Sequence, residues 1–435
     1  MKRKIIEKLL EWKKSIGRKP LILHGARQVG KSWSLLEFGK LYYKDVIYIN
    51  FETNLRLCKE FDSDISPKFL INRMELFFEK RINPEETLII FDEVQVCERA
   101  LTSLKYFCED APNYHVVAAG SLLGVAVNRE KYSFPVGKVD LMHLYPLDFE
   151  EFLWANKRDM LADEITECFN SIKPMGEAMH QMALELYKTY LIVGGMPAAV
   201  TEYLKESRMI DAARVQSLIL DTYVADMAKY ASPSDVTKTL ACFNSLPSQL
   251  AKDNRKFQYK VIQKGGSASL FGVSIDWLSS AGVIAKCMKI TEGRPPIAVY
   301  QDLSSFKVYM SDVGLLAVKS GVVPHDILGG GNIFVGAITE NYVANALLSN
   351  SFNLYYWASD SQAEVDFVIQ DYDRAIPIEV KANLHVKSRS LSVFMQKYKP
   401  EFGIRVSAKN FGFEGGVKSV PLYAVYCIKP RIIER

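Results

Sequence analysis

The segment Gly25–Ser32, with the sequence GARQVGKS, constrains the fold more than any other part of the chain. It fits the pattern GxxxxGK(S/T), follows the apolar run Leu21–His24, and precedes Trp33–Lys40, whose apolar residues recur at helical spacing. In such a strand–loop–helix context, the two glycines let successive backbone N–H groups point at phosphate oxygens, and the helix N-terminus adds its positive dipole end. The segment therefore predicts a phosphate-binding loop; the alternative is a glycine-rich turn without a ligand.

Each residue of this loop has a predicted part in holding a nucleotide, with ATP and Mg²⁺ as the cofactors. The residues that would cradle the phosphates are Gly25, Ala26, Arg27, Gln28, Val29, Gly30, Lys31 and Ser32. The ammonium of Lys31 would bridge the β- and γ-phosphates and assist catalysis, and the hydroxyl of Ser32 would be a ligand of Mg²⁺. The loop alone thus predicts ATP binding.

A second element adds the groups that hydrolysis needs, because Thr87–Glu93 is an apolar run that ends in two acids. Asp92 would hold Mg²⁺ directly or through water, and Glu93 would polarise the water that attacks the γ-phosphate. Two solvated acids after a core strand are the alternative. Ser121 follows the apolar run His115–Gly120 and would contact the γ-phosphate or the water, with a helix cap as an equal alternative.

Short apolar runs alternate with amphipathic stretches over residues 19–125, and this pattern predicts a parallel sheet with helices on both faces. The runs are Leu21–His24, Val46–Phe51, Leu88–Phe91 and Val116–Ala119. The predicted fold class is therefore α/β.

The rest of the chain has three patterns. Residues 148–250 have helical spacing, broken at Gly194–Pro197, and residues 251–290 predict a small helix-turn-helix with a β-rich wing. Residues 330–435 return to mixed α/β, with a helix near Phe334–Leu348. Strands are expected near Leu354–Trp357, Glu364–Gln370, Ala375–Val380 and Leu422–Ile428.

Carboxylates and a lysine near the C-terminus predict a second site. Glu379 and Lys381 lie two apart on one expected strand, so both point to the same face. If that face meets Asp366, and Glu340 from the preceding helix, three oxygen ligands for Mg²⁺ converge. Glu379 would also take part in catalysis, and Lys381 would orient or deprotonate a water that attacks a phosphodiester. The spacing resembles restriction-endonuclease and Holliday-junction-resolvase sites; a binding module without cleavage, or strand-end salt bridges, are the alternatives.

The net charge of +4 is unevenly spread along the chain. Residues 1–20 hold 8 basic and 2 acidic residues, and residues 381–435 hold 11 basic and 3 acidic residues. A basic C-terminal segment permits a polyanion such as DNA as a partner, and an ordinary solvated surface is the alternative. Tyr355, Tyr356 and Trp357 suit either a nucleic-acid surface or the core. The helix expected over Ser267–Ala281 offers few base-reading groups, which favours phosphate contact or protein packing.

Short motifs along the chain give it a resemblance to a known family. They are GARQVGKS (25–32), LIIFDEVQ (88–95), AAGS (118–121), LYPLDFEEFL (144–153), GGMP (194–197), KVYMSDVGLLA (307–317), YYWASDSQAEVDFVI (355–369) and IPIEVKA (376–382). In these motifs and their order the chain resembles the bacterial and archaeal AAA+-type ATPases that carry a C-terminal domain of unknown function with a restriction-endonuclease-like fold. The resemblance covers nearly the whole chain.

The resemblance implies four domains. These are an additional-strand P-loop NTPase core at 1–145, a helical lid at 146–235, a winged helix at 236–325 and a restriction-endonuclease-like domain at 326–435. One departure concerns the segment before LYPL, where the family usually carries an Arg and this chain has Val136–Lys138. Lysine is only a point charge, whereas arginine can fork across phosphate oxygens. Arg129 is the alternative cation, and a surface role is the other interpretation for both residues.

Composition excludes several other classes of protein. With 49% apolar and 24% charged residues, the chain is neither mainly disordered nor fibrous. The longest nearly uncharged stretch, Leu191–Thr201, is too short to span a bilayer, so no membrane partner is predicted. Seven cysteines without a CxxC argue against a disulfide framework or a zinc site and predict a reduced, cytoplasmic protein.

The sequence thus predicts an ATPase that couples hydrolysis to a DNA-handling C-terminal domain. The alternative is an ATP-gated switch or binding module whose nuclease-like domain is inactive. The predicted partners are a nucleotide, DNA and an unidentified protein, and an oligomer is compatible with the sequence.

Overall fold

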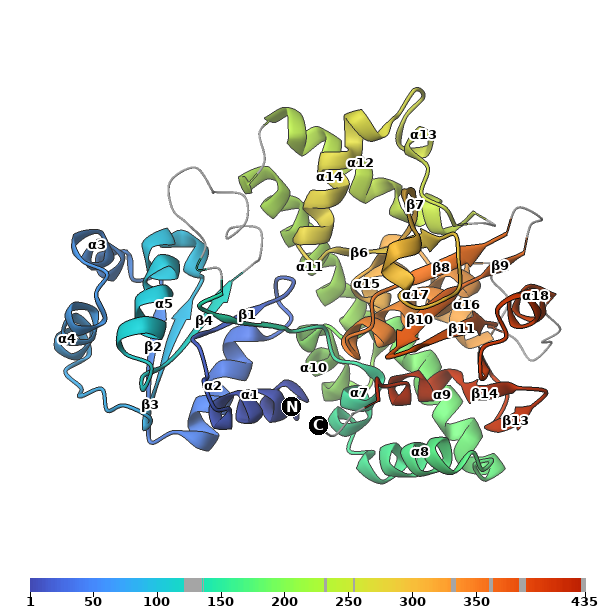
Figure 1. Cartoon of the computed structure of the whole chain (residues 1–435), viewed down its shortest axis with the longest axis horizontal. Coiled ribbons are helices and arrows are strands. Elements are labelled where there is room, and N and C mark those ends of the chain that lie inside the picture. The colour runs from blue at the N-terminus through green and yellow to red at the C-terminus, as the bar shows by residue number, and fades with distance from the viewer. Residues whose placement is uncertain are drawn as a thin grey trace. The chain divides into compact units, whose positions relative to one another are not determined.

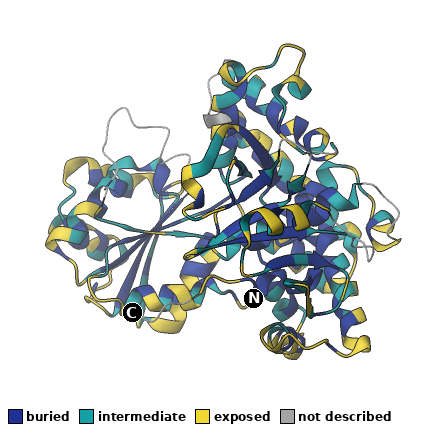
Figure 2. Cartoon of the chain, turned by 45° about the vertical axis from the view of Figure 1, so that its right-hand side comes forward, coloured by how far each residue is buried: buried dark blue, intermediate teal, exposed yellow. Residues whose placement is uncertain are grey.

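A computed structural model describes residues 1–120, 135, 137–230, 233–252, 255–329, 334–359, 363–382 and 389–431 (Figure 1). The chain divides into two compact units. The N-terminal unit comprises residues 3–145 with 280–282, and the C-terminal unit comprises residues 1–2, 146–279 and 283–435. In both units the strands are mostly buried, while the helices expose one side (Figure 2).

The N-terminal unit is built on a five-stranded sheet of order β2-β3-β4-β1-β5, in which every pair is parallel. Its strands are β1 Leu21–His24, β2 Asp45–Asn50, β3 Thr87–Asp92, β4 His115–Gly120 and β5 Asp140–His143. The predicted parallel sheet is therefore confirmed. Because all strands run the same way, the loops after β1, β3 and β4 leave the sheet at one edge.

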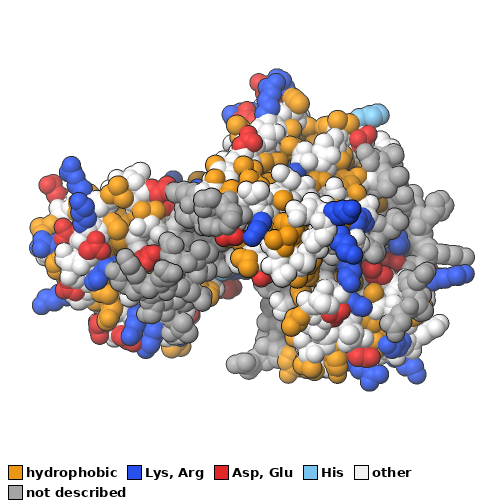
Figure 3. All heavy atoms as spheres, turned by 90° about the horizontal axis from the view of Figure 1, so that it is seen from above, with side chains coloured by type: hydrophobic (Ala, Val, Ile, Leu, Met, Phe, Trp, Pro, Cys, Tyr) orange, Lys and Arg blue, Asp and Glu red, His pale blue; other side chains and the backbone are white. Residues whose placement is uncertain are grey.

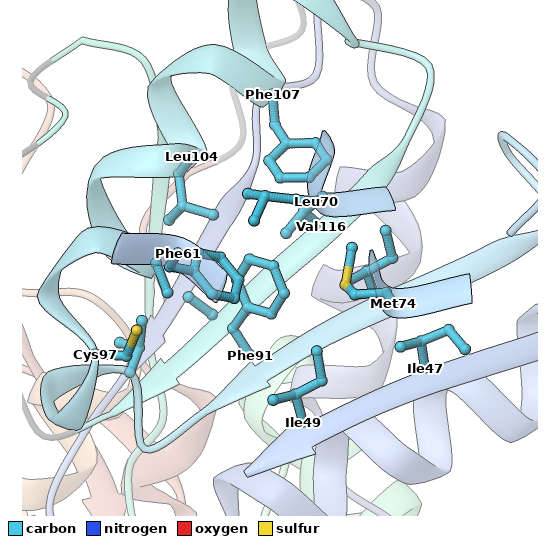
Figure 4. Packing of buried hydrophobic residues seen from close by; sticks show 14 of the residues in the cluster. Ile47, Ile49, Phe61, Leu70, Met74, Phe91, Cys97, Leu104, Phe107 and Val116 are labelled. Carbon is cyan, nitrogen blue, oxygen red and sulfur yellow. The ribbon is translucent and has the colours of Figure 1, made fainter. Parts of the chain in front are cut away.

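Helices cover both faces of this sheet, which explains why its strands are continuous apolar runs. They are α1 Ile5–Lys14, α2 Lys31–Tyr42, α3 Leu55–Ser63, α4 Pro67–Phe78, the 3₁₀ turn η1 Val94–Val96, and α5 Glu98–Asp110. On one face α3, α4 and α5 bury Phe61, Leu70 and Phe107 against the strands, with Phe91 among them (Figure 4). On the other face α2 approaches closely, since a Cβ at Gly39 would lie 2.5 Å from Val46 Cγ2.

The first part of the C-terminal unit is helical, as predicted for residues 148–250. Its helices are α7 Phe149–Ala155, α8 Asp159–Ser171, α9 Glu177–Val193, α10 Pro197–Glu206, α11 Met209–Tyr230, α12 Pro233–Leu250, α13 Tyr259–Ile262 and α14 Ala268–Ser280. The predicted break follows α9, where a Cβ at Gly195 would lie 2.0 Å from the carbonyl oxygen of Leu147. Asp312 closes the same junction by accepting the Gly195 N–H at 2.6 Å.

Two sheets follow in this unit. The four-stranded sheet, of order β7-β6-β8-β9, comprises β6 Ile284–Ile290, β7 Gln301–Met310, β8 Tyr355–Ala358 and β9 Glu364–Val365. The five-stranded sheet, of order β10-β11-β12-β14-β13, comprises β10 Phe367–Asp371, β11 Arg374–Val380, β12 Gly403–Ser407, β13 Gly412–Glu414 and β14 Val417–Pro421. The accompanying helices are η2 Ile297–Tyr300, α15 Val313–Lys319, α16 Pro324–Gly329, α17 Val335–Ser349, α18 Arg389–Tyr398 and η3 Leu422–Cys427.

One predicted strand is wrong. Residues 422–427 form the 3₁₀ helix η3, in which every residue is buried. A short, uninterrupted apolar run has no periodicity that separates a buried strand from a buried helix, so the sequence pattern was ambiguous here. The β-rich run after α14 is β6, which pairs antiparallel with β7 and parallel with β8. The β-rich run expected as a wing thus belongs to the same sheet as β8, a strand from the C-terminal third of the chain.

Candidate nucleotide-binding site

The loop between β1 and α2 has the backbone shape that its glycines predict. Gly30 has φ of 94°, in the left-handed region, where it precedes the first residue of α2. Gly25 approaches the segment after β5 so closely that a Cβ would lie 2.2 Å from the carbonyl oxygen of Leu144. Any larger side chain at residue 25 would displace backbone, so the loop can close over the sheet edge only with glycine there.

Lys31 begins α2 and is buried inside the loop. Its ammonium donates to the carbonyl oxygens of Gly25, at 3.0 Å, and Ala26, at 2.9 Å. Burial lowers the pKa of Lys31 to about 8, although the charges of Glu93 and Asp92 act in the opposite direction. A cation that has lost part of its hydration and faces only carbonyl oxygens is stabilised by an arriving anion, because an opposite charge favours the charged form.

A tyrosine of the neighbouring strand holds one of the two predicted magnesium ligands. Asp92 ends β3 and is buried; its Oδ2 accepts from the Tyr48 hydroxyl at 2.6 Å, and its Oδ1 accepts from the backbone N–H of Glu93 at 3.0 Å. Burial, with the bond to Asp92, raises the pKa of Tyr48 to about 12, and Ser32 is near enough to act on that pKa in the opposite direction. Tyr48 thus fixes the Asp92 carboxylate close to Ser32, from the strand next to β3.

Sequence reasoning missed Tyr48. The only signal was its place in β2, where Tyr48 pairs with Ile90 two residues before Asp92. Its role depends on β2 lying beside β3, which the order of strands along the chain does not reveal.

Glu93 lies next to Asp92 in a left-handed conformation with φ of 50°. Its Oε2 accepts from the side-chain amide of Gln95, which is buried. The other atom of that amide, Gln95 Oε1, has no hydrogen-bond partner among the described residues, and a Cβ at Gly120 would lie 2.5 Å from it. A non-glycine residue in this conformation costs of order 1 kcal/mol, so the surrounding contacts hold Glu93 in place. Gln95 is a second residue that the sequence analysis did not assign.

Two histidines lie at the same edge, at the ends of paired strands. His24 ends β1 and His143 ends β5; their rings are 4.6 Å apart and perpendicular. Burial, and then the charge of Lys31, lowers the pKa of His24 to about 4. Burial, then His24 and Lys31, lowers that of His143 to about 3. Both rings are therefore neutral at pH 7, and they add no charge beside the loop.

Of the further cations and the hydroxyl predicted near the phosphates, the structure describes only Lys138. Lys138 forms an ion pair with Glu109 at 2.8 Å, so its ammonium already has a carboxylate partner. Ser121, Arg129 and Val136 lie outside the residues that the structure describes.

The C-terminal carboxylates form two groups rather than the one predicted. Glu340, on α17, is buried and accepts from Lys307 at 3.2 Å and from the Tyr309 hydroxyl at 2.5 Å, and it also pairs with Arg255. Lys307 is itself buried and lies 2.6 Å from Glu364. Both oxygens of Glu340 are therefore engaged by cations, and the structure does not bring Glu340 to the other acids as a free ligand.

Asp366, Glu379 and Lys381 do come together. Phe367 pairs with Ile378 in the antiparallel register, so Asp366 and Glu379 lie opposite each other. Asp366 Oδ2 accepts from the backbone N–H of Val380 at 2.8 Å, and Glu379 Oε1 lies 3.2 Å from the ammonium of Lys381. Glu379 is buried, and its Oε2 has no partner in the described part of the chain. Among described residues no group of three or more His, Cys, Asp or Glu side chains is arranged to hold a metal ion.

The aromatic residues before these strands belong to the core. Tyr355, Tyr356 and Trp357 form β8 and are all buried, so the nucleic-acid surface considered for them is excluded. On the face shown in Figure 3, the described Lys and Arg side chains are scattered among acidic and apolar ones rather than gathered in one stripe.

Three segments of the chain match models of protein families. Residues 17–153 match the family model of the AAA domain. This match includes the phosphate loop and the acids after β3, and it supports nucleotide binding by this unit. Residues 184–326 and 335–425 match two further models, each described as a domain of unknown function (DUF8612 and DUF4143). No curated protein matches the chain.

Solved structures with a similar chain path include three archaeal proteins. A Walker-type ATPase of Pyrococcus abyssi is 17% identical over 73% of this chain and 95% of its own, with a TM-score of 0.42. The ORC2 protein of Aeropyrum pernix is 12% identical over 78% of this chain and 91% of its own, with a TM-score of 0.35. The ORC1 protein of the same organism, solved with DNA, is 11% identical over 74% and 91%, with a TM-score of 0.27. At such low scores these likenesses carry no further argument.

No helix among the described residues is long and apolar enough to cross a membrane.

Proposed function

We propose that the N-terminal unit binds ATP with Mg²⁺ and hydrolyses it. The observation that carries this proposal is the buried Asp92 carboxylate, held by the hydroxyl of Tyr48, beside a loop that encloses a desolvated lysine and is followed by the Ser32 hydroxyl. A hydroxyl and a carboxylate are oxygen ligands of the kind that Mg²⁺ accepts alongside phosphate oxygens and waters. When bound, the ion would neutralise charge that develops on the β- and γ-phosphates.

The other residues of the site would each act on ATP or on the attacking water. Lys31 would leave the carbonyl oxygens of the loop and bind the phosphates, where its positive charge is stabilised. Glu93 would accept a proton from the water, or orient it for in-line attack, while Gln95 fixes the direction of the carboxylate. Two further roles are proposed: Ser121 would contact the γ-phosphate or the attacking water, and either Arg129 or Lys138 would be the cation that completes the site.

The experiment is a comparison of ATP binding and turnover in a Glu93→Gln variant. The amide keeps the size of the side chain but cannot act as a base, so we expect turnover to fall by about 10²–10⁴-fold while ATP binding is retained. Glu98→Gln, a charge-matched change in the first turn of α5, serves as the control. Turnover in Glu93→Gln that equals the wild-type rate would remove Glu93 from the mechanism.

A second function is favoured by the free oxygen of Glu379. A buried carboxylate oxygen without a partner, opposite Asp366, suits a cation bound by these two acids, and Mg²⁺ commonly uses one or two carboxylates and several waters. We propose that this pair, with Lys381 beside it, forms the metal-dependent phosphodiester site of a DNA-handling domain, without Glu340. The alternative is a binding module whose position is set by ATP.

A DNA cleavage assay distinguishes the nuclease from the binding module. Labelled linear and branched DNA is incubated with Mg²⁺ or Mn²⁺, with and without ATP. Cleavage that disappears in Glu379→Gln supports the nuclease. Turnover of ATP without cleavage by either protein supports the binding module. We also propose that the C-terminal unit is divided into a helical lid, a winged helix and a nuclease-like domain. Coupling to an unidentified protein partner and the formation of an oligomer are proposed as well. Seven free thiols favour a reducing, cytoplasmic setting.

A further inference from the structure

A cavity of about 470 Å³ lies at the opposite edge of the N-terminal sheet from the phosphate loop. It is lined by Lys13, Ser15, Gly17, Arg18, Glu85, Pro112 and His115. These residues precede β1, β3 and β4 along the chain, whereas the phosphate loop follows β1. Its volume falls in the range of pockets that hold small molecules.

Two cations of this cavity are held by neutral groups. The Lys13 ammonium donates to the carbonyl oxygen of Tyr42 and lies 3.8 Å from the centre of the Tyr43 ring. The Arg18 guanidinium donates to the carbonyl oxygen of Pro112 at 2.8 Å and lies 5.3 Å from the Trp12 ring. Neither cation has a carboxylate within ion-pair distance among the described residues, although Glu85 and Asp140 are near enough to act on Arg18. Both positive charges are thus held in place by neutral groups, and neither is in a direct ion pair within the described part of the chain.

A buried histidine forms the inner wall. His115 is 5% exposed, and its Nδ1 shares a hydrogen bond of 2.6 Å with the Tyr43 hydroxyl. Its other ring nitrogen, Nε2, is the one left for a ligand. Burial, followed by the charges of Arg18 and Lys13, lowers the pKa of His115 to about 3, so the ring is neutral at pH 7.

We propose that this cavity binds a small anion with a phosphate or carboxylate group, at a site separate from the nucleotide site. Lys13 and Arg18 would contact the anionic group, and His115 would hydrogen-bond to it through Nε2. Glu85 also lines the cavity and favours a ligand that carries a hydroxyl or amine donor as well as its anionic group. The best-matched class is a small hydroxylated phosphate ester or carboxylate.

The test uses histidine resonances of the full chain labelled at the imidazole ring. His115 reports on the cavity, and His24 and His143 report on the phosphate loop in the same spectrum. Inorganic phosphate, glycerol phosphate and citrate are titrated in turn, which separates phosphate from carboxylate ligands. We expect a saturable shift of His115 with at least one probe, at concentrations that leave His24 and His143 unmoved.

Arg18→Gln should raise the midpoint of the His115 shift about tenfold, the value of one charged hydrogen bond. Lys14→Gln, an exposed neighbour with the same change in charge, should leave the midpoint unchanged. If Arg18→Gln does not fold, the partly buried Lys13→Gln replaces it. The proposal is overturned if no probe shifts His115, if only His24 and His143 move, or if the cavity variants bind as tightly as the wild type.

Discussion

The Tyr48 hydroxyl offers a direct test of how the nucleotide site is held together. Tyr48→Phe removes only the hydroxyl oxygen and leaves Asp92 Oδ2 without its donor at 2.6 Å. A hydrogen bond to a charged group contributes about 1.5–3 kcal/mol. Because Tyr48 is only partly buried, water can replace some of that contact, so we take the lower value, about 1.5 kcal/mol. This corresponds to roughly a tenfold change in an equilibrium constant.

The assay is ATP hydrolysis as a function of Mg²⁺ concentration, together with urea unfolding of the nucleotide-free protein. We expect the Mg²⁺ concentration for half-maximal rate to rise about tenfold in Tyr48→Phe, because the Asp92 carboxylate is no longer oriented by its hydroxyl donor. Tyr42→Phe, at an exposed position of α2, is the matched control. If Tyr48→Phe lowers the free energy of unfolding but requires no more Mg²⁺ than the wild type, the hydroxyl supports the fold only, and the reasoning is refuted.

Two further predictions concern the C-terminal unit. Lys307→Met removes a buried cation that pairs with the buried Glu340 and with the partly exposed Glu364, and it should lower the free energy of unfolding by about 3–5 kcal/mol in urea titrations; a loss below about 1 kcal/mol would contradict the assignment. Burial raises the pKa of Asp312 to about 6, above the usual value for an aspartate, so the folded state favours the protonated form. Its stabilising effect is therefore complete below about pH 4 and is lost as the pH rises through 6, by about 3 kcal/mol in total. Unfolding measured from pH 4 to 7 should show this loss in the wild type and not in Asp312→Asn, and equal slopes would be evidence against it.

The sequence was most informative where a local pattern alone determines structure. Gly25 and Gly30 mark a loop whose shape only glycine permits, so the loop could be located from its spacing. The runs that became β3 and β4 were found because strands buried on both faces are continuously apolar. The strands that carry Asp366 and Glu379 were expected to bring the two acids together if their faces met, and the register of β10 with β11 places the acids opposite each other; their role as metal ligands stays a prediction.

Residues that act across the sheet could not be found in this way. Tyr48 reaches Asp92 only because β2 lies beside β3. Lys307, on β7, reaches Glu340 on α17 and Glu364 on β9 only in the folded unit, because these elements are far apart along the chain. Nothing in the spacing of these residues along the chain marks them. For the same reason Glu340 was expected among the metal ligands, although two cations from earlier segments occupy it. The 3₁₀ helix over Leu422–Cys427 was missed because its residues are uniformly apolar.

The measurement that tests the central claim most directly is a titration of the protein with ATP in the presence of Mg²⁺, comparing the wild type with Lys31→Ala. Lys40→Ala, an exposed lysine on the same helix, is the control. If the loop binds the phosphates, the wild type and Lys40→Ala should bind ATP with the same affinity, and Lys31→Ala should lose at least about tenfold, the value of one charged hydrogen bond. Equal ATP affinity in all three proteins would contradict the assignment of Gly25–Ser32 as the nucleotide site.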